Sequence, residues 1–86
     1  MFVNLGGNIR VFSREILGIF DFDEFTSSQD GQEFYWHLKQ TKQIENADKN
    51  KVPQSIVLCV DEKNNEKYYL SPISAASLKK SQGGDL

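Results

Sequence analysis

The chain has 86 residues, enough for one domain with a thin core, because a chain of this size buries roughly 60 to 65% of its unfolded surface. Its formal net charge of −2 differs from that of a typical nucleic-acid-binding domain, which is basic overall. A single cysteine excludes an intrachain disulfide, and the sequence shows neither a signal-peptide pattern nor a long apolar run, so we expect a cytoplasmic protein with no membrane partner.

The charge is unevenly distributed along the chain. Residues 1–48 carry four basic and eight acidic side chains, a sum of −4, whereas residues 49–86 carry six lysines and four acidic side chains, a sum of +2. Such an uneven charge distribution suits a protein with one face that attracts a charged partner and one face that is neutral or repellent. Charges scattered over the surface give similar sums.

The N-terminal segment predicts a β-hairpin followed by a third strand. Apolar and polar residues alternate from Phe2 to Leu5, stop at Gly6-Gly7-Asn8, and then alternate again. Glycine and asparagine tolerate the positive φ that short hairpin turns require. Residues 15–22 are β-branched and aromatic, so we expect a mostly buried strand that bulges at Gly18.

Residues 32–43 predict a helix. Its possible N-caps are Ser27, Ser28 and Asp30, and Asp30 has the spacing of a capping box with Glu33. The packing face is the stripe at helical spacing formed by Phe34, His37, Leu38, Thr41 and Ile44.

The C-terminal half predicts a polar loop, a hairpin and a short helix. Residues 56–60 are typical of a central strand, residues 68–70 of its return strand, and "SPISAASLKK" of a helix that begins near Pro72 or Ser74. Residues 81–86 are expected to be a frayed tail. Together these elements predict an α+β fold in residues 1–86: a small antiparallel sheet of about five strands, one central helix and a short C-terminal helix.

The residue types needed for catalysis or for metal binding do not occur in suitable patterns. His37 is the sole histidine, no serine lies in a nucleophile elbow, and one cysteine with one histidine cannot supply a four-ligand metal set. We interpret His37 as a helix residue that faces the sheet, Cys59 as a small buried hydrophobe, and the carboxylates of residues 21–24 as solvated surface. We therefore expect no enzyme, no cofactor and no small-molecule substrate.

Two segments of the chain, "FVNLGGNIRVFSREILGIFDFD" and "SIVLCV...YYLSPISAASLKK", carry a family resemblance. Together and in this order they resemble the bacterial extracellular-matrix regulators of the RemA/RemB family, and the RemB branch in particular. Residues 24–54 share with that family only a helix and a polar loop.

The resemblance implies a small α+β DNA-binding protein that assembles into a ring and acts in the transcription of matrix and biofilm genes. In the RemA branch, binding looks to depend on an arginine after the second strand and on paired arginines before the long central strand. Arg14 matches the first arginine, but the pair has no counterpart, and Lys49 and Lys51 in "DKNKVPQS" are the nearest basic residues. Arg14, Lys49 and Lys51 are thus the implied contacts to phosphates of double-stranded DNA.

A ring would let a mildly acidic subunit bind DNA, because each basic residue is repeated around the assembly and weak phosphate contacts add together. Subunits would be held through the sheet edges and apolar faces of the N-terminal hairpin and of the hairpin at residues 56–70. The alternative is an oligomeric protein-interaction module of the same family that has lost DNA binding, which the acidic balance and the missing arginine pair favour.

Each named residue also has a structural alternative. Arg14 could pair with Asp21 across the sheet, and Lys49 and Lys51 could be ordinary solubility charges. Tyr68 and Tyr69 could stack on bases or pack in a core. Lys79 and Lys80 could serve only the end of the terminal helix.

Overall fold

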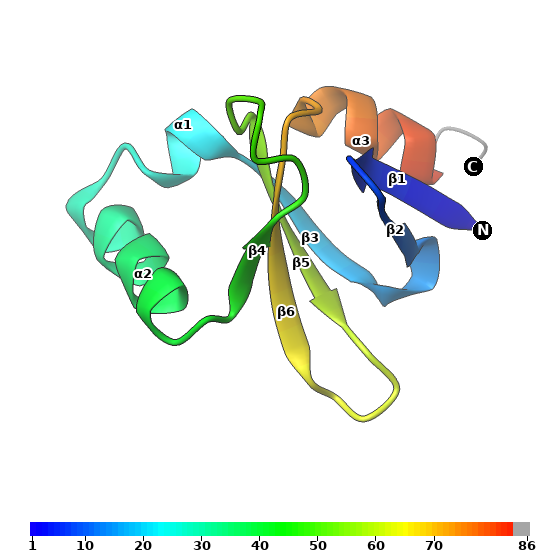
Figure 1. Ribbon diagram of the computed structural model, residues 1–86, viewed down its shortest axis with the longest axis horizontal. Helices are drawn as coiled ribbons and strands as arrows, with labels where there is room; N and C mark the ends of the chain where they lie inside the picture. The colour runs from blue at the N-terminus through cyan, green and yellow to red at the C-terminus, as the bar shows by residue number, and fades with distance from the viewer. Residues whose placement is uncertain (84–86) are drawn as a thin grey trace.

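Six strands form two separate sheets in the computed structural model, which describes residues 1–83 (Figure 1). A two-stranded sheet contains β1 (Phe2–Gly6) and β2 (Ile9–Phe12). A four-stranded sheet has the order β3 (Ile16–Asp21), β5 (Ser55–Val60), β6 (Glu66–Ser71) and β4 (Ile44–Asn46). The helices are the 3-10 turn η1 (Ser13–Glu15), α1 (Phe22–Phe25), α2 (Gln29–Gln40) and α3 (Ala75–Gly83).

The α+β class is confirmed, but the expectation of one antiparallel sheet of about five strands is wrong. The turn η1 redirects the chain between β2 and β3, so the N-terminal hairpin packs over the larger sheet and does not extend it. The strand β4 was missed because Lys42 ends the helical segment with a φ of +58°, which frees Ile44 to pair with Tyr68. The pairing of β4 with β6 is parallel.

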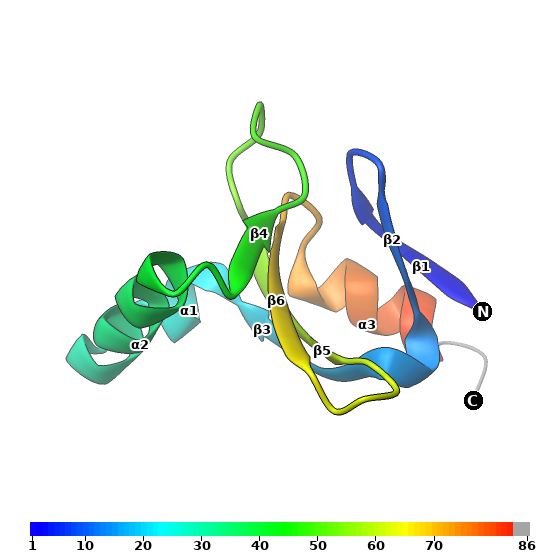
Figure 2. The same ribbon diagram turned by 60° about the horizontal axis from the view of Figure 1, so that its bottom comes forward.

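Strand β5 is buried on both faces and divides the core in two. Ile56 and Val57 are neighbours in the chain, point to opposite faces of the sheet, and are both fully buried. Val57 packs with the N-terminal hairpin and α3, whereas Ile56 packs with Leu38 of α2. Figure 2 shows the hairpin and α3 on one side of the sheet and α2 on the other. The prediction of a central strand is confirmed.

Because β5 and β6 are the inner strands, they offer no free sheet edge. The expectation that the hairpin at residues 56–70 joins subunits through sheet edges is therefore wrong, whereas a subunit contact through its apolar faces stays a prediction. The larger sheet instead ends at β3 on one side and at β4 on the other.

The predicted N-terminal hairpin and the predicted bulge in β3 are confirmed. Gly6 and Gly7 have φ values of +114° and +54°, which β-carbon-bearing residues rarely adopt. In β3 the register with β5 shifts between Ile16 and Gly18. A β-carbon on Gly18 would lie 2.8 Å from the ring of Phe20, so a larger residue at this position would have to displace that exposed ring.

Strand β3 ends one residue earlier than predicted because Asp21 caps a short helix. Its carboxylate accepts a hydrogen bond of 2.9 Å from the backbone N–H of Glu24, and Phe22 begins α1. Part of the acidic cluster at residues 21–24 therefore has a structural role at a helix N-terminus.

Helix α2 begins and ends three residues earlier in the chain than the predicted range 32–43. Ser28 is the N-cap, since its Oγ accepts a 3.0 Å hydrogen bond from the Gly31 N–H, and Asp30 lies inside the first turn. Of the expected packing stripe only Leu38 on α2 is buried, and His37 is exposed, so the expectation that His37 faces the sheet is wrong. Tyr35 packs instead, with its ring centroid 5.4 Å from that of Phe22.

Helix α3 follows Ser74, whose Oγ accepts a 3.2 Å hydrogen bond from the Ser77 N–H. The predicted start of this helix is confirmed, and Lys80 lies in its last turn. Residues 81–83 are helical, so the expected frayed tail is wrong for them, and residues 84–86 lie outside the described part of the chain. Within residues 1–83, none of the helices has the length and apolar character needed to cross a bilayer.

Buried serines join the two sheets. The Ser71 hydroxyl donates a 2.6 Å hydrogen bond to the carbonyl oxygen of Leu5 in β1 and accepts one of 3.1 Å from the Ile73 N–H. Ser55 in turn donates to the Ile73 carbonyl oxygen at 2.8 Å. The N-terminal hairpin is thereby fixed to the end of β6.

Replacing Ser71 by alanine is expected to destabilise the domain by about 1 to 3 kcal/mol, because the buried Leu5 carbonyl loses its hydrogen-bond donor. Urea unfolding followed by circular dichroism measures the change. The exposed Ser81→Ala variant is the control and is expected to lie within about 0.5 kcal/mol of the wild type. Equal effects of the two substitutions would contradict the role of Ser71.

Candidate nucleic-acid interface

Arg14 lies in η1, between the N-terminal hairpin and the larger sheet, and its side chain is exposed. The guanidinium carbon lies 4.4 Å from the centroid of the Phe12 ring. Within residues 1–83, an ion pair joins Lys67 Nζ to Glu45 Oε1 at 2.8 Å. In the same residues, Arg14 has no carboxylate oxygen within ion-pair distance. The alternative in which Arg14 pairs with Asp21 is therefore wrong.

The outer face of the hairpin carries two stacked aromatic rings. Phe2 and Phe12 are directly opposite each other in the register of β1 and β2, and their ring centroids are 4.4 Å apart with an angle of 24° between the planes. Arg10 also lies on this face, with its guanidinium carbon 5.2 Å from the Phe2 centroid. The inner residues of the same strands, Val3 and Val11, are buried.

Lys49 and Lys51 are exposed on the loop between β4 and β5. Side-chain and backbone hydrogen bonds shape this loop: the Asp48 carboxylate accepts from the Asn50 N–H at 3.1 Å, and the Asp48 carbonyl accepts from the Lys51 N–H at 3.2 Å. The negative charge of Asp48 thus lies next to the two lysines and reduces the positive potential of the loop.

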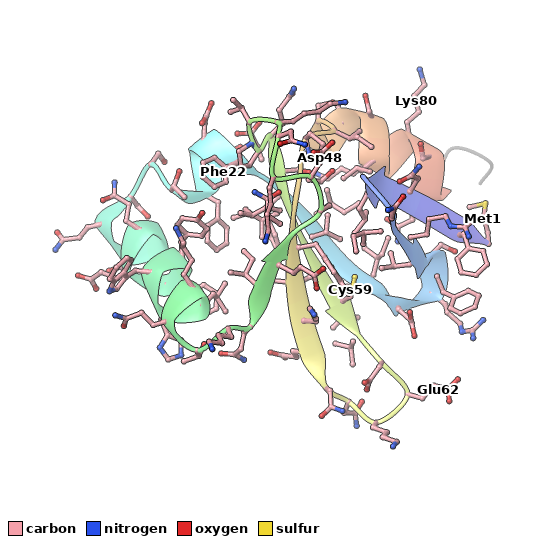
Figure 3. All side chains as sticks on the ribbon, viewed as in Figure 1. Met1, Phe22, Asp48, Cys59, Glu62 and Lys80 are labelled. Atoms are coloured by element: carbon pink, nitrogen blue, oxygen red, sulfur yellow. The ribbon has the colours of Figure 1, made fainter. Side chains whose placement is uncertain are left out.

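The structure does not bring Arg14 and the two lysines together. The base of the loop contacts the tip of the N-terminal hairpin, where a β-carbon on Gly7 would overlap the Ala47 carbonyl. Arg14 lies beyond the opposite end of β2, next to Ser13, whose N–H donates to the Met1 carbonyl at 2.8 Å. A four-residue strand is about 13 Å long, and Met1 and Asp48 lie well apart in Figure 3.

Three other residues considered from the sequence, Tyr68, Tyr69 and Cys59, are buried or half-buried in the domain. Tyr68 is buried against the edge of Phe34, and Tyr69 is half-buried beside Lys67, in accord with packing in a core. Cys59 is buried near the middle of the domain (Figure 3). Across residues 1–83, the histidine, cysteine and carboxylate side chains form no group of three that could hold a metal ion.

Several titratable groups reflect these surroundings. Burial, with a smaller contribution from the Glu15 carboxylate, raises the pKa of the Cys59 thiol to about 11, so the thiol is protonated and unreactive at neutral pH. Burial raises the pKa of Tyr68 and Tyr69. The hydrogen bond from Lys67 to Glu45 raises the pKa of the lysine.

Comparison with known proteins identifies the relatives of this chain. No family model matches it. The chain is 38% identical over 80 residues to extracellular matrix regulatory protein B of Bacillus subtilis (strain 168), and the match covers 93% of this chain and 88% of that protein. The chain belongs to the family of extracellular matrix regulatory protein B.

Membership in this matrix-regulator family confirms the resemblance drawn from the two end segments of the sequence. The match extends through α2 and through residues 47–54, the loop that carries Lys49 and Lys51 and is called the lysine loop below, because 80 aligned residues include most of the chain. Arg10 was not among the residues selected from the sequence. Its signal was the alternation of Arg10 and Phe12 in the predicted hairpin, which places both on one face of the strand.

The raised pKa of Cys59 predicts that the domain loses stability in alkaline solution. The folded thiol, with a pKa of about 11, keeps its proton, whereas the thiol of the unfolded chain loses it near its model value of 9.0. Rising pH therefore favours unfolding between about 9 and 11. In Cys59→Ala the decline of the free energy of unfolding with rising pH is expected to be smaller, by up to about 1.4 kcal/mol per pH unit.

Urea unfolding of both proteins from pH 8 to pH 11 measures this difference. The difference in free energy of unfolding at pH 8 gives the cost of the cavity left by the substitution. Only the slope of that free energy against pH above pH 9 reports the titration of the thiol. Tyr68 contributes equally to both proteins, whereas the pKa of Tyr69 is raised in part by Cys59, so the difference in slope includes this smaller coupled contribution. Parallel slopes would contradict a shifted thiol.

Proposed function

We propose that this protein is a non-catalytic, DNA-associated regulator of extracellular matrix genes in the cytoplasm. It binds duplex DNA through phosphate contacts of basic residues that are repeated around a homo-oligomeric ring. The name of its relative describes a regulatory protein of the extracellular matrix, which supports the regulatory role. The observation that carries the proposal is the exposed Arg14 guanidinium, which is stacked on Phe12 and has no carboxylate partner within residues 1–83.

An arginine held in this way is suited to phosphate. The guanidinium presents a planar fork of N–H donors that matches two phosphate oxygens, and stacking on a ring leaves those in-plane donors free. Lys49 and Lys51 add point charges at the other end of the hairpin. Phosphate contacts of this kind position a protein on DNA without reading the sequence.

The ring supplies what one protomer lacks. Arg14 and the lysine loop lie at opposite ends of β2, and the chain has a net charge of −2, so a single copy presents a weak and divided positive surface. Repetition around a closed assembly places many copies of each group along one DNA molecule, and the contacts then add together.

The free edge of β3 is a suitable subunit contact. Among the described strands β3 pairs only with β5, and two of its side chains, Leu17 and Phe20, are 64% and 40% exposed. An unpaired strand with apolar side chains readily adds a strand from a neighbour. The N-terminal hairpin has free edges of its own.

The ring predicts a mass in solution that is a multiple of 9.8 kDa. Size-exclusion chromatography with light scattering measures it. Leu17→Lys is expected to lower the mass, because a charge next to the β3 edge opposes strand addition. Val52→Lys, at an 80% exposed loop position, is the control and is expected to leave the mass unchanged. A monomeric wild-type protein would contradict the ring.

DNA binding predicts an affinity that falls steeply with salt. For Arg14→Ala we expect about tenfold weaker binding to duplex DNA at low salt, the cost of a lost charged hydrogen-bond contact. The slope of log affinity against log salt should decrease by about 0.9 for each phosphate contact removed. Fluorescence anisotropy with a labelled duplex measures both quantities. If the wild-type protein shows no binding at low salt, the protein-interaction module is the better description.

A further inference from the structure

We propose that Arg10 is a second phosphate-binding residue, and that Arg10 and Arg14 act as a pair whose spacing is set by the stacked rings of Phe2 and Phe12. This inference rests on the proposed DNA binding and adds a residue to the Arg14 contact. The four side chains, Arg10, Phe2, Phe12 and Arg14, are called the arginine–phenylalanine stack below.

The strand register builds the stack. Phe2 is directly opposite Phe12, and Arg10 is opposite Asn4, so Arg10 lies diagonal to Phe2 on the same outer face of the hairpin. Diagonal neighbours in an antiparallel pair are close enough for a long side chain to cover a ring. Arg14 follows Phe12 by two residues and returns over its ring through η1. The order is thus Arg10, Phe2, Phe12, Arg14.

The stack fixes the two guanidinium groups at a defined separation. Each ring uses one face against the other ring, at 4.4 Å between centroids, and therefore offers its outer face to an arginine. The guanidinium carbons lie 5.2 and 4.4 Å from their ring centroids, so they are at most about 14 Å apart. The Phe2 and Phe12 rings are stacked on each other, and each has one of the two guanidinium groups over it.

That separation fits a polyanion with regularly spaced charges. Duplex DNA carries a phosphate at about every 3.4 Å of axial rise along each strand, and its major groove is about 12 Å wide. Two guanidinium groups at the ends of the stack can therefore contact two different phosphates, either on one strand or across a groove. Inorganic phosphate is a single anionic group and cannot repeat its contacts along the stack as a duplex does.

The stack also prepares both arginines for binding. Cation–π contact with a phenyl ring restricts the long side chain before the ligand arrives, which lowers the entropy cost of ordering it. Both arginines are exposed, and the ion pair found in residues 1–83, between Lys67 and Glu45, does not involve them. Duplex DNA is favoured over an acidic protein segment because Arg10 and Arg14 present rigid forks that match phosphate oxygens.

The test uses the full chain and a labelled duplex of about 20 base pairs, close to two helical turns. Binding is measured from about 50 to 200 mM salt for the wild type, Arg10→Gln, Arg14→Gln and Lys39→Gln. Lys39 is the matched control: it carries the same charge, its Nζ lies 5.4 Å from the Tyr35 ring, and it belongs to α2, at the other end of the domain (Figure 1). Its substitution measures the effect of net charge alone.

We expect Arg10→Gln to weaken binding about tenfold and to decrease the salt slope by about 0.9 per lost contact, as Arg14→Gln does and beyond the effect of Lys39→Gln. Phe12→Leu keeps both charges but removes the stacking ring. It is therefore expected to weaken binding with an unchanged salt slope. Inorganic phosphate is expected to compete poorly with the duplex.

Three results would overturn the inference. If Arg10→Gln behaves like Lys39→Gln while Arg14→Gln weakens binding, the inference fails and the proposed function stands. If Arg10→Gln changes the mass measured by light scattering, Arg10 contacts a neighbouring subunit or another protein and not DNA. If the wild type does not bind the duplex at low salt, the proposed function fails and the inference fails with it.

Discussion

The burial of β5 on both faces is the constraint on which the rest of this fold depends. Ile56 and Val57 are both fully buried, so each face of the larger sheet needs its own cover. A chain of 86 residues has few elements with which to provide two covers. It uses α2 for one face and the N-terminal hairpin with α3 for the other, which leaves both layers thin and several aromatic side chains exposed.

The packing of the N-terminal hairpin on one face of the larger sheet explains the position of the candidate site. The hairpin must turn Val3, Leu5 and Val11 toward the sheet, and strand alternation then forces Phe2 and Phe12 outward. Two phenyl rings in water gain by stacking on each other and by receiving the flat guanidinium groups of neighbouring arginines. The surface that supports Arg14 is thus a by-product of packing on the opposite face of the same hairpin.

Local patterns predicted the parts of the fold that local rules determine. The turn at Gly6 and Gly7, the bulge at Gly18, the central strand and the start of α3 at Ser74 each follow from a few adjacent residues. The parallel strand β4 and the division into two sheets depend on contacts distant in sequence, such as Ile44 with Tyr68. The helical spacing of Ile44 and His37 with Leu38 therefore predicted a packed helix face that the structure does not have.

The candidate site was predictable only in part for the same reason. Arg14 was selected through a family resemblance, and the family is confirmed by the match to extracellular matrix regulatory protein B. The exposure of Arg14 and its stacking on Phe12 required the strand register. The resemblance did not point to Arg10, and its place on the ring of Phe2 required the diagonal relation in the strand register.

The close approach of Gly7 to Ala47 has a consequence for how this family can diversify. The base of the lysine loop is locked against the hairpin tip, where neither the backbone conformation nor the available space accepts a larger residue at position 7. Residues 49–52, by contrast, are all exposed to solvent and are not part of the packed core. Basic residues can be exchanged there, or removed, without disturbing the scaffold, so the electrostatic potential of this surface can change while the fold stays the same.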